Sequence, residues 1–316
     1  MNPTVVLRRV LELLATLLMT SFVMFAALYV VPGSPIAYLT RGRATDAQTI
    51  ERIKVQYDLN EPFFPRYWHW LTGLFQGHLG TSLVSNEPTW TLLQSRMTTT
   101  AMLVLLATVE TVVVGVLLGV VAALSRRAID ATITIGSTIG MGIPGFAAAA
   151  ALISVFAVSL GWFPLVGSGS GFFGHLDHVV LPSVALAISS VAYMTRLTRS
   201  AVREERSKEY VDTANARGLP PAQIVRRHVL RNALPSILTA GGVSFVGLMA
   251  SEVVVESAFG LNGMGSLLVQ SVEAKDFAVV QVLVLMYVAV FMVVNTLIDV
   301  VAMKVDPRLA REAGGS

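Results

Sequence analysis

Cysteine is absent from this 316-residue chain, and charged residues make up only 14% of it. The absence of cysteine excludes disulfides, thiolate metal sites and a cysteine nucleophile. An ordinary soluble domain has roughly 25% charged residues. The low charge, together with a hydrophobic fraction of 54%, therefore indicates an integral membrane protein whose surface contacts lipid.

Lysine is also scarce, and none of the four lysines belongs to a phosphate-binding loop. Such a loop ends in Gly-Lys followed by Ser or Thr, whereas Lys54, Lys208, Lys275 and Lys304 follow Ile, Ser, Ala and Met. Any nucleotide energy that the protein uses would therefore have to come from another polypeptide.

Motifs for metal binding and for nucleophilic catalysis are incomplete as well. The five histidines include no helical His-Glu-x-x-His pair, so we expect no metal site. His175 and His178 have a spacing that suits a shared metal, but we interpret them as polar residues of a loop. The G-x-S-x-G turn of a serine nucleophile would need serine where the chain has Gly169. These absences argue against an intramembrane enzyme.

The chain is basic, with a net charge of +3 and a pI near 9.3. Its basic residues collect in short connections beside apolar runs, which is typical of topology determinants rather than of nucleic-acid binding. We therefore expect no nucleic-acid partner.

Six apolar runs dominate the sequence, and each is near or above the roughly 17 to 25 residues that cross a bilayer. The first is longer than the apolar core of a signal peptide, so we interpret it as a retained span. The sequence predicts an all-α membrane protein, a single transmembrane domain with six transmembrane helices. The runs cover residues 10–31, 99–124, 133–160, 179–195, 235–255 and 277–303.

Basic residues in the connections predict the orientation. Two arginines follow the second run, nine basic residues lie within 196–234, and three follow the last run, whereas 161–178 has none. We therefore expect both termini in the cytoplasm and residues 32–98 as a long extracytoplasmic insert. Within this insert, amphipathic helices are predicted for Thr45–Gln56 and Phe64–Phe75.

Small residues and one proline stand out inside the spans. Gly115 and Gly119 have the four-residue spacing that lets two helix backbones approach closely in lipid, so we expect them to serve packing. Pro144 lies within the third run and is expected to kink that helix, because proline removes a backbone donor.

Besides Glu12 near the start of the first run, four carboxylates lie within or directly at the end of the later apolar runs: Glu110, Glu252, Glu256 and Asp299. Ionisable groups at membrane depth are costly and usually face protein or water, so each is a candidate for a transport pathway or an intramembrane polar contact. For Glu110 both interpretations stay open. For Glu256 and Asp299, which lie close to the interfaces, we favour a structural pairing with an arginine.

The one long, densely charged segment is Arg196–Pro235, which contains nine of the 23 basic residues. Its first half is rich in helix formers up to Arg217 and closes with Gly218, a residue that readily ends helices. Its second half restarts at Pro221, which suits a first helical turn, and we expect Pro235 to break it. The segment is predicted to form a helix, a sharp turn and a second short helix in the cytoplasm.

This segment resembles the cytoplasmic coupling loop of the dipeptide/oligopeptide/nickel permeases of bacterial ABC importers, and the chain looks dipeptide-permease B-like. The matching residues are EYVDTANARG at 209–218 and RHVLRNALP at 227–235. The general permease loop begins Glu-Ala-Ala, where this chain has DTA at 212–214. Further family motifs follow in order along the chain: VPGSP at 31–35, GHLGTS at 77–82, GWFP at 161–164, VESAFGLNGMG at 255–265 and DPR at 306–308.

The resemblance implies a type I ABC importer permease that crosses the bacterial cytoplasmic (inner) membrane several times. The implied partners are a second homologous permease subunit, two ABC ATPase subunits and an extracytoplasmic substrate-binding protein. ATP and Mg would bind to the ATPases, so this chain is expected to be non-catalytic and to hold no cofactor.

The resemblance also implies which residues couple the chain to its ATPases. Gly218 would make the tight turn, and Asp212, Ala214 and Arg217 would line the docking face. The full set of coupling residues that it implies is Glu209, Tyr210, Asp212, Ala214, Arg217, Gly218, Arg227, His228 and Pro235.

Short peptides, meaning dipeptides and oligopeptides, are the substrates that the resemblance implies first. Nickel chelates, haem and glutathione are alternatives for the same architecture. A protein of another class, a stand-alone proton-coupled secondary transporter, is suggested by Glu110 and Glu252.

Overall fold

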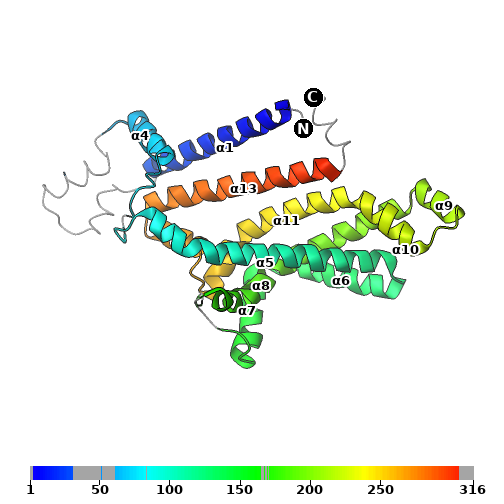
Figure 1. Ribbon diagram of the computed structural model, residues 1–316. Coiled ribbons are helices and arrows are strands. Elements are labelled where there is room, and N and C mark those ends of the chain that lie inside the picture. Colours follow the sequence, from blue (N-terminus) through cyan, green and yellow to red (C-terminus); the bar gives the residue numbers. More distant parts are fainter. Residues whose placement is uncertain are drawn as a thin grey trace. The chain divides into compact units, whose positions relative to one another are not determined.

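The computed structural model describes residues 3–30, 51, 61–82, 84–164, 167, 169 and 171–305 (Figure 1). Helices form most of this described part, which confirms the all-helical class, and one isolated bridge joins Thr81 and Pro88. The helix predicted at Thr45–Gln56 falls outside the described residues except at position 51. The chain divides into two compact units, namely unit 1 (Met1–Arg96 and Leu267–Met292) and unit 2 (Met97–Ser266 and Val293–Ser316).

Unit 1 contains two helices that pack through aromatic side chains, α1 (Pro3–Val30) and α4 (Phe63–Phe75). The buried ring of Phe25 on α1 contacts Tyr67 and Trp70 of α4, with ring centroids 5.4 and 5.5 Å apart. Ser21 Oγ lies 2.8 Å from the Tyr67 hydroxyl. The amphipathic helix predicted for Phe64–Phe75 is confirmed to within one residue.

Unit 1 also fixes the end of the GHLGTS motif. The Ser82 hydroxyl donates a hydrogen bond to the Asp276 carboxylate, and the backbone N–H of Ser85 donates to Ser82 Oγ at 3.0 Å. The side chains of Ser82 and Asp276 are both buried. The motif is therefore held beside the residue that precedes α13 (Phe277–Val305).

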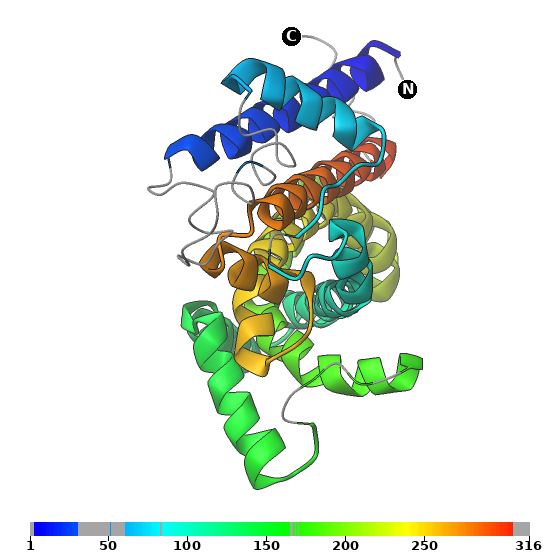
Figure 2. The ribbon, with the colours of Figure 1, turned by 90° about the vertical axis from the view of Figure 1, so that its left-hand side faces the viewer.

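Unit 2 is organised around one long helix, α8 (Gly171–Arg206), which packs against α11, α6 and α7. Figure 2 shows α7 and the π-helical η1 as one rod. The other elements of unit 2 are most of α5 (Thr89–Leu124), α6 (Arg127–Gly142), α7 (Gly145–Leu152), η1 (Ile153–Ser159), α9 (Glu209–Ala216), α10 (Pro221–Ile224), the π-helical η2 (Val225–Val229) and α11 (Leu230–Phe259).

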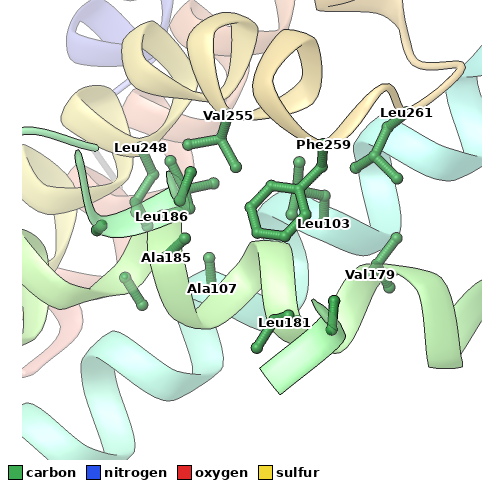
Figure 3. Close-up of a cluster of buried hydrophobic side chains, with 14 residues drawn as sticks. Leu103, Ala107, Val179, Leu181, Ala185, Leu186, Leu248, Val255, Phe259 and Leu261 are labelled. Carbon is green, nitrogen blue, oxygen red and sulfur yellow. The ribbon is translucent and has the colours of Figure 1, made fainter. Parts of the chain in front are cut away.

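Two apolar clusters stabilise unit 2. In the first, Leu103 of α5, Leu186 of α8 and Phe259 of α11 meet in a buried core (Figure 3). The second cluster includes Val202, Val211 and Ile224 and lies at the end of the unit that carries α9 and α10. We call it the elbow core, because it joins the last turns of α8 to these two short helices.

Four helices of the described part are long and apolar enough to cross a membrane. They are Thr89–Leu124, Gly171–Arg206, Pro221–Phe259 and Phe277–Ile298. A fifth span results if α6 and the α7–η1 rod count as one bent element, and α1 contributes a shorter apolar stretch, Leu11–Ala27. The count of six spans, the side of the termini and the position of the insert stay predictions.

The two prolines singled out in the sequence behave differently. The kink predicted at Pro144 is confirmed as a full break, because α6 ends at Gly142, α7 starts at Gly145 and the two helices are bent by 103°. The break predicted at Pro235 is wrong, since α11 continues through it. Proline costs a helix one backbone hydrogen bond. Here the buried side chains of Ala233 and Ile237 hold the helix in the elbow core on both sides of the proline.

Close packing at the glycine pair is confirmed. A Cβ atom at Gly119 would lie 2.5 Å from Thr198 Cβ and 2.7 Å from the Thr195 carbonyl oxygen, and one at Gly115 would lie 2.6 Å from Met194 Cβ. Heavy atoms in contact normally stay about 3.5–4.0 Å apart. Even alanine at these positions would therefore push α5 away from α8.

We expect Gly119→Ala to destabilise the protein by about 1–3 kcal/mol, the cost of overpacking. Gly136 is the matched control, because a Cβ there meets no atom within 4 Å. Gly136→Ala should be neutral or should stabilise α6 by up to about 1 kcal/mol. The measurement is unfolding of the detergent-solubilised protein by heat or denaturant. Equal midpoints for the two variants would refute this account of the α5–α8 contact.

Candidate functional site

We call the segment formed by α9, α10 and the turn between them the elbow. It begins just after the end of α8. The prediction that one helix continues to Arg217 is wrong in one respect, because α8 stops at Arg206 and α9 starts only at Glu209. Ser207 Oγ turns back to the Glu204 carbonyl at 2.9 Å. Serine favours such local bonds at helix ends, which explains the interruption.

A polar cluster around Glu205 fixes the angle between α8 and α9. Lys208 Nζ donates to Glu205 Oε1 at 2.5 Å, and the Tyr210 hydroxyl donates to Glu205 Oε2 at 2.6 Å. Tyr210 also shares a side-chain hydrogen bond with Asn232 of α11. Burial, and then the Glu205 contact, raise the pKa of Tyr210, so its hydroxyl keeps its proton and stays a donor.

Gly218 ends α9 in the way that its sequence position predicts. Its φ is +73°, in the left-handed region that glycine adopts without strain. Its N–H donates to the Asn215 carbonyl at 2.9 Å, and the N–H of Leu219 donates to the Ala214 carbonyl at 3.2 Å. These two bonds cap the last turn and direct the chain back toward α10.

The predicted docking residues do not all share one surface. Ala214 is only 5% exposed and packs in the elbow core, so its side chain offers little surface to a docking partner. Alanine suits a buried position where α9 lies flat on the apolar cluster. Asp212 and Arg217 are exposed, as predicted for that face. We define the α9 face by the exposed residues Asp212, Thr213, Asn215, Ala216 and Arg217.

The remaining coupling residues surround this face. Glu209 and Arg227 are exposed, whereas Tyr210, His228 and Pro235 are half-buried. Arg227 and His228 lie on η2, whose five residues form a π-helical stretch between α10 and α11. Such stretches are rare and are frequently found at functional sites. The sequence pattern gave no sign of it.

An ion-pair cluster that the sequence did not reveal ties the same end of α8 to α6. Asp130 is 8% exposed and accepts hydrogen bonds from Arg199 Nε and, at 2.9 Å, from Arg199 Nη2. Arg203 Nη2 donates to the same carboxylate at 2.8 Å. A bidentate arginine contact is among the strongest polar contacts in proteins. It makes α6 and the elbow end of α8 one mechanical element.

Glu256 has a structural role, but its predicted arginine partner is wrong. Its carboxylate is fully buried and accepts hydrogen bonds from Thr100 Oγ1 at 2.5 Å and from the Ser266 N–H at 3.0 Å. Thr100 Oγ1 in turn accepts from the Met264 N–H at 2.8 Å. Glu256 therefore fastens the loop that follows α11 to α5.

The other intramembrane carboxylates have different surroundings. Glu252 is fully buried, and a Cβ at Gly265 would lie 2.9 Å from its carboxylate. Glu110 accepts a hydrogen bond from Ser183 Oγ of α8 at 2.9 Å. Asp299 falls in α13, but its side chain is outside what the structure describes.

The histidines at 175 and 178 lie in the first turns of α8 rather than in the loop where they were placed. His178 Nδ1 is 2.8 Å from the Gly174 carbonyl oxygen, within its own helix. Among the described residues, no group of three or more potential ligands is placed to hold a metal ion.

Comparison with protein families matches residues 115–311 to a binding-protein-dependent transport system inner membrane component. Residues 4–104 match the N-terminal family of such membrane components. These matches include the elbow, the Asp130 cluster and Glu256.

Named relatives match along nearly their whole length. The chain is 35% identical over 308 residues to the glutathione transport system permease protein GsiC of Escherichia coli strain K12, covering 96% of this chain and 98% of that protein. The same identity holds over 305 residues for GsiC of Salmonella choleraesuis strain SC-B67, with the same coverage.

Among solved structures, the fold is similar to inward-facing conformations of the MetNI methionine ABC transporter. The TM-score is 0.57 at 20% identity, covering 69% of this chain and 98% of that chain. A second crystal form of the same transporter gives a TM-score of 0.56.

Proposed function

The chain belongs to the inner membrane components of binding-protein-dependent transport systems, the permeases of ABC importers, and from this we propose that it carries short peptides and is driven through its elbow. In this proposal a second homologous permease completes the channel. Two ATPases hydrolyse ATP beneath it, and an extracytoplasmic binding protein delivers the substrate. The chain itself catalyses no reaction.

The observation that carries the coupling role is the attachment of α9. This helix presents an exposed face, yet the Glu205 cluster and the elbow core fix it to α8 and α11. A displacement applied to the α9 face would therefore pass to two long helices as a rigid-body movement. The Asp130 cluster would carry it on to α6.

For the substrate, the names of the relatives favour glutathione, one of the alternatives to dipeptides and oligopeptides. The matched permeases of Escherichia coli and Salmonella choleraesuis belong to glutathione transport systems. Glutathione is itself a tripeptide, so it is the first ligand to test, beside a dipeptide and an oligopeptide. The test is ATP-dependent uptake by the reconstituted importer with its binding protein. Uptake of a nickel chelate or haem instead of any peptide would overturn the peptide assignment.

Contact between the α9 face and an ATPase is testable by crosslinking, because the chain has no native cysteine. We expect a single cysteine at Ala216→Cys to crosslink to an ATPase subunit in the assembled importer. Phe173→Cys is the control, since it is 81% exposed but lies in the first turns of α8, at the opposite end of that helix from α9. Crosslinking of the control alone, or of neither, would contradict the docking proposal.

The coupling role predicts a second result. We expect Arg217→Glu to lower peptide uptake by about tenfold or more, because it reverses a charge on the α9 face. Folding should be unaffected, since the side chain is exposed. Arg126→Glu, an exposed substitution in the α5–α6 connection, should leave uptake near the wild-type rate. Normal uptake by Arg217→Glu would count against coupling through this face.

A further inference from the structure

A cavity of about 520 Å³ lies in unit 2 between α5, α6 and α8. Its walls are mostly small or apolar and include Leu118 of α5, Gly136 and Gly140 of α6, and Val184 of α8. Along α8 the lining runs from Val184 to Thr195, which corresponds to about 16 Å of helix. This volume falls within the roughly 300–1,000 Å³ of small-molecule sites.

Glu110 brings a carboxylate to this cavity. Its Oε1 accepts a hydrogen bond from Ser183 Oγ at 2.9 Å, but the same hydroxyl also lies 2.8 Å from the Val180 carbonyl oxygen. A serine has one hydroxyl proton, so Oε1 receives only part of a hydrogen bond. Its Oε2 is buried without a hydrogen-bond partner among the described residues.

The other polar groups of the lining do not donate a hydrogen bond to Glu110 Oε2. Ser137 Oγ donates to the Ile133 carbonyl at 2.6 Å, and Thr195 Oγ1 donates to the Val191 carbonyl at 2.7 Å, each within its own helix. No lysine or arginine is among the lining residues. Within the described part of the cavity, the Glu110 carboxylate can therefore accept further hydrogen bonds, and the donor has to come from a molecule that enters the cavity.

We propose that this cavity is a transient site on the translocation path, where Glu110 receives the ammonium group of a passing peptide. The inference rests on the proposed function and deepens it by naming the group that is recognised. Carboxylates at membrane depth usually face protein or a water-filled cavity and mark substrate pathways. An ammonium supplies both the charge and the hydrogen-bond donors that Oε2 lacks.

The dimensions and the apolar walls suit such a cargo. An extended peptide spans at most about 3.6 Å per residue, so a chain of about four residues fits the 16 Å length. The walls offer no second charged contact. Binding at a single carboxylate is weak enough for the peptide to leave again, as passage requires.

The test labels Glu110 with dicyclohexylcarbodiimide, which modifies carboxyl groups in apolar surroundings. The assembled importer is placed in nanodiscs of phosphatidylcholine and phosphatidylglycerol, which have no primary ammonium group. Mass spectrometry then follows modification of Glu110 with and without trialanine. We expect trialanine at about ten times its Kd to slow the labelling by about tenfold. N-acetyl-trialanine, which has no ammonium group, should leave the labelling rate unchanged.

Three results would overturn the inference: protection by neither peptide, equal protection by both, or protection by added phosphatidylethanolamine and not by trialanine. The last would identify the cavity as a lipid site. Asp177→Asn removes an exposed carboxylate from the start of α8 and should label and protect like the wild type.

Transport kinetics give a second, separable readout. We expect Glu110→Gln to raise the KM for trialanine uptake by about tenfold, the effect of losing one charge-assisted hydrogen bond. The KM for the acetylated peptide should not change. An unchanged KM for trialanine would refute the role of Glu110. Failure of the wild-type importer to take up any peptide would instead refute the proposed function, and the labelling result would still stand.

Discussion

Replacing Glu256 by alanine is expected to destabilise the protein by about 3–5 kcal/mol. The carboxylate is fully buried and accepts the hydroxyl proton of Thr100 and the N–H of Ser266. Without it, a buried hydroxyl and a buried backbone N–H lose their acceptors, each at a cost of about 1–3 kcal/mol, and a cavity adds to the loss. The measurement is the unfolding midpoint of the purified protein.

Two further variants show whether the carboxylate acts through these bonds. Glu256→Gln keeps the size and one acceptor oxygen, so it should lose less stability than the alanine variant. Gly263→Ala should also destabilise, because a Cβ there would overlap the Glu256 carboxylate. If Glu256→Ala unfolded at the wild-type midpoint, the loop after α11 would not depend on this contact.

Removal of the Asp130 carboxylate should have the next largest effect. Asp130→Ala leaves the guanidinium groups of Arg199 and Arg203 close together with no anion between them. Breaking a buried pair is strongly destabilising, but the Arg203 side chain is 45% exposed, so we expect a smaller loss of stability than for Glu256→Ala.

A coupling role of the Asp130 cluster predicts a functional effect that a purely structural role would not produce. If Asp130 joins α6 to the elbow, then Asp130→Asn, which keeps an acceptor, should assemble normally but hydrolyse more ATP per peptide transported. Arg203→Ala should cost less stability than Arg199→Ala, because Arg199 makes the bidentate contact. An unchanged ratio of ATP hydrolysed to peptide transported in Asp130→Asn would separate the cluster from coupling.

The sequence predicted features that depend on local chemistry. Apolar runs located the long apolar helices of the described part, Gly218 located the end of α9, and the spacing of Gly115 and Gly119 indicated the close helix contact. In each case the residue type itself limits the backbone or the burial. The same reasoning predicted too long a helix at the end of α8, because helix formers lie on both sides of Ser207.

Features that depend on distant partners were not predictable. Glu256 meets a hydroxyl 156 positions earlier in the chain, and Asp130 meets arginines 69 and 73 positions later. Ala214 is small enough for either a surface or a core, so only the fold decides. Pro144 and Pro235 have the same chemistry. Packing around α11 keeps that helix continuous through Pro235, whereas the chain breaks between α6 and α7 at Pro144.

The length of α8 bears on the proposed coupling to the ATPases. Pro182 lies inside α8, and Figure 2 shows the first turns of the helix running across the direction of the rest. The 24 residues from Ser183 to Arg206 extend about 36 Å, whereas the hydrocarbon layer is about 30 Å thick. In the proposed coupling this part of α8 acts as a lever arm, and a tilt of about 8° about one end moves the other by about 5 Å. A small rocking of the bundle within lipid thus corresponds to a stroke in water as long as one helical turn.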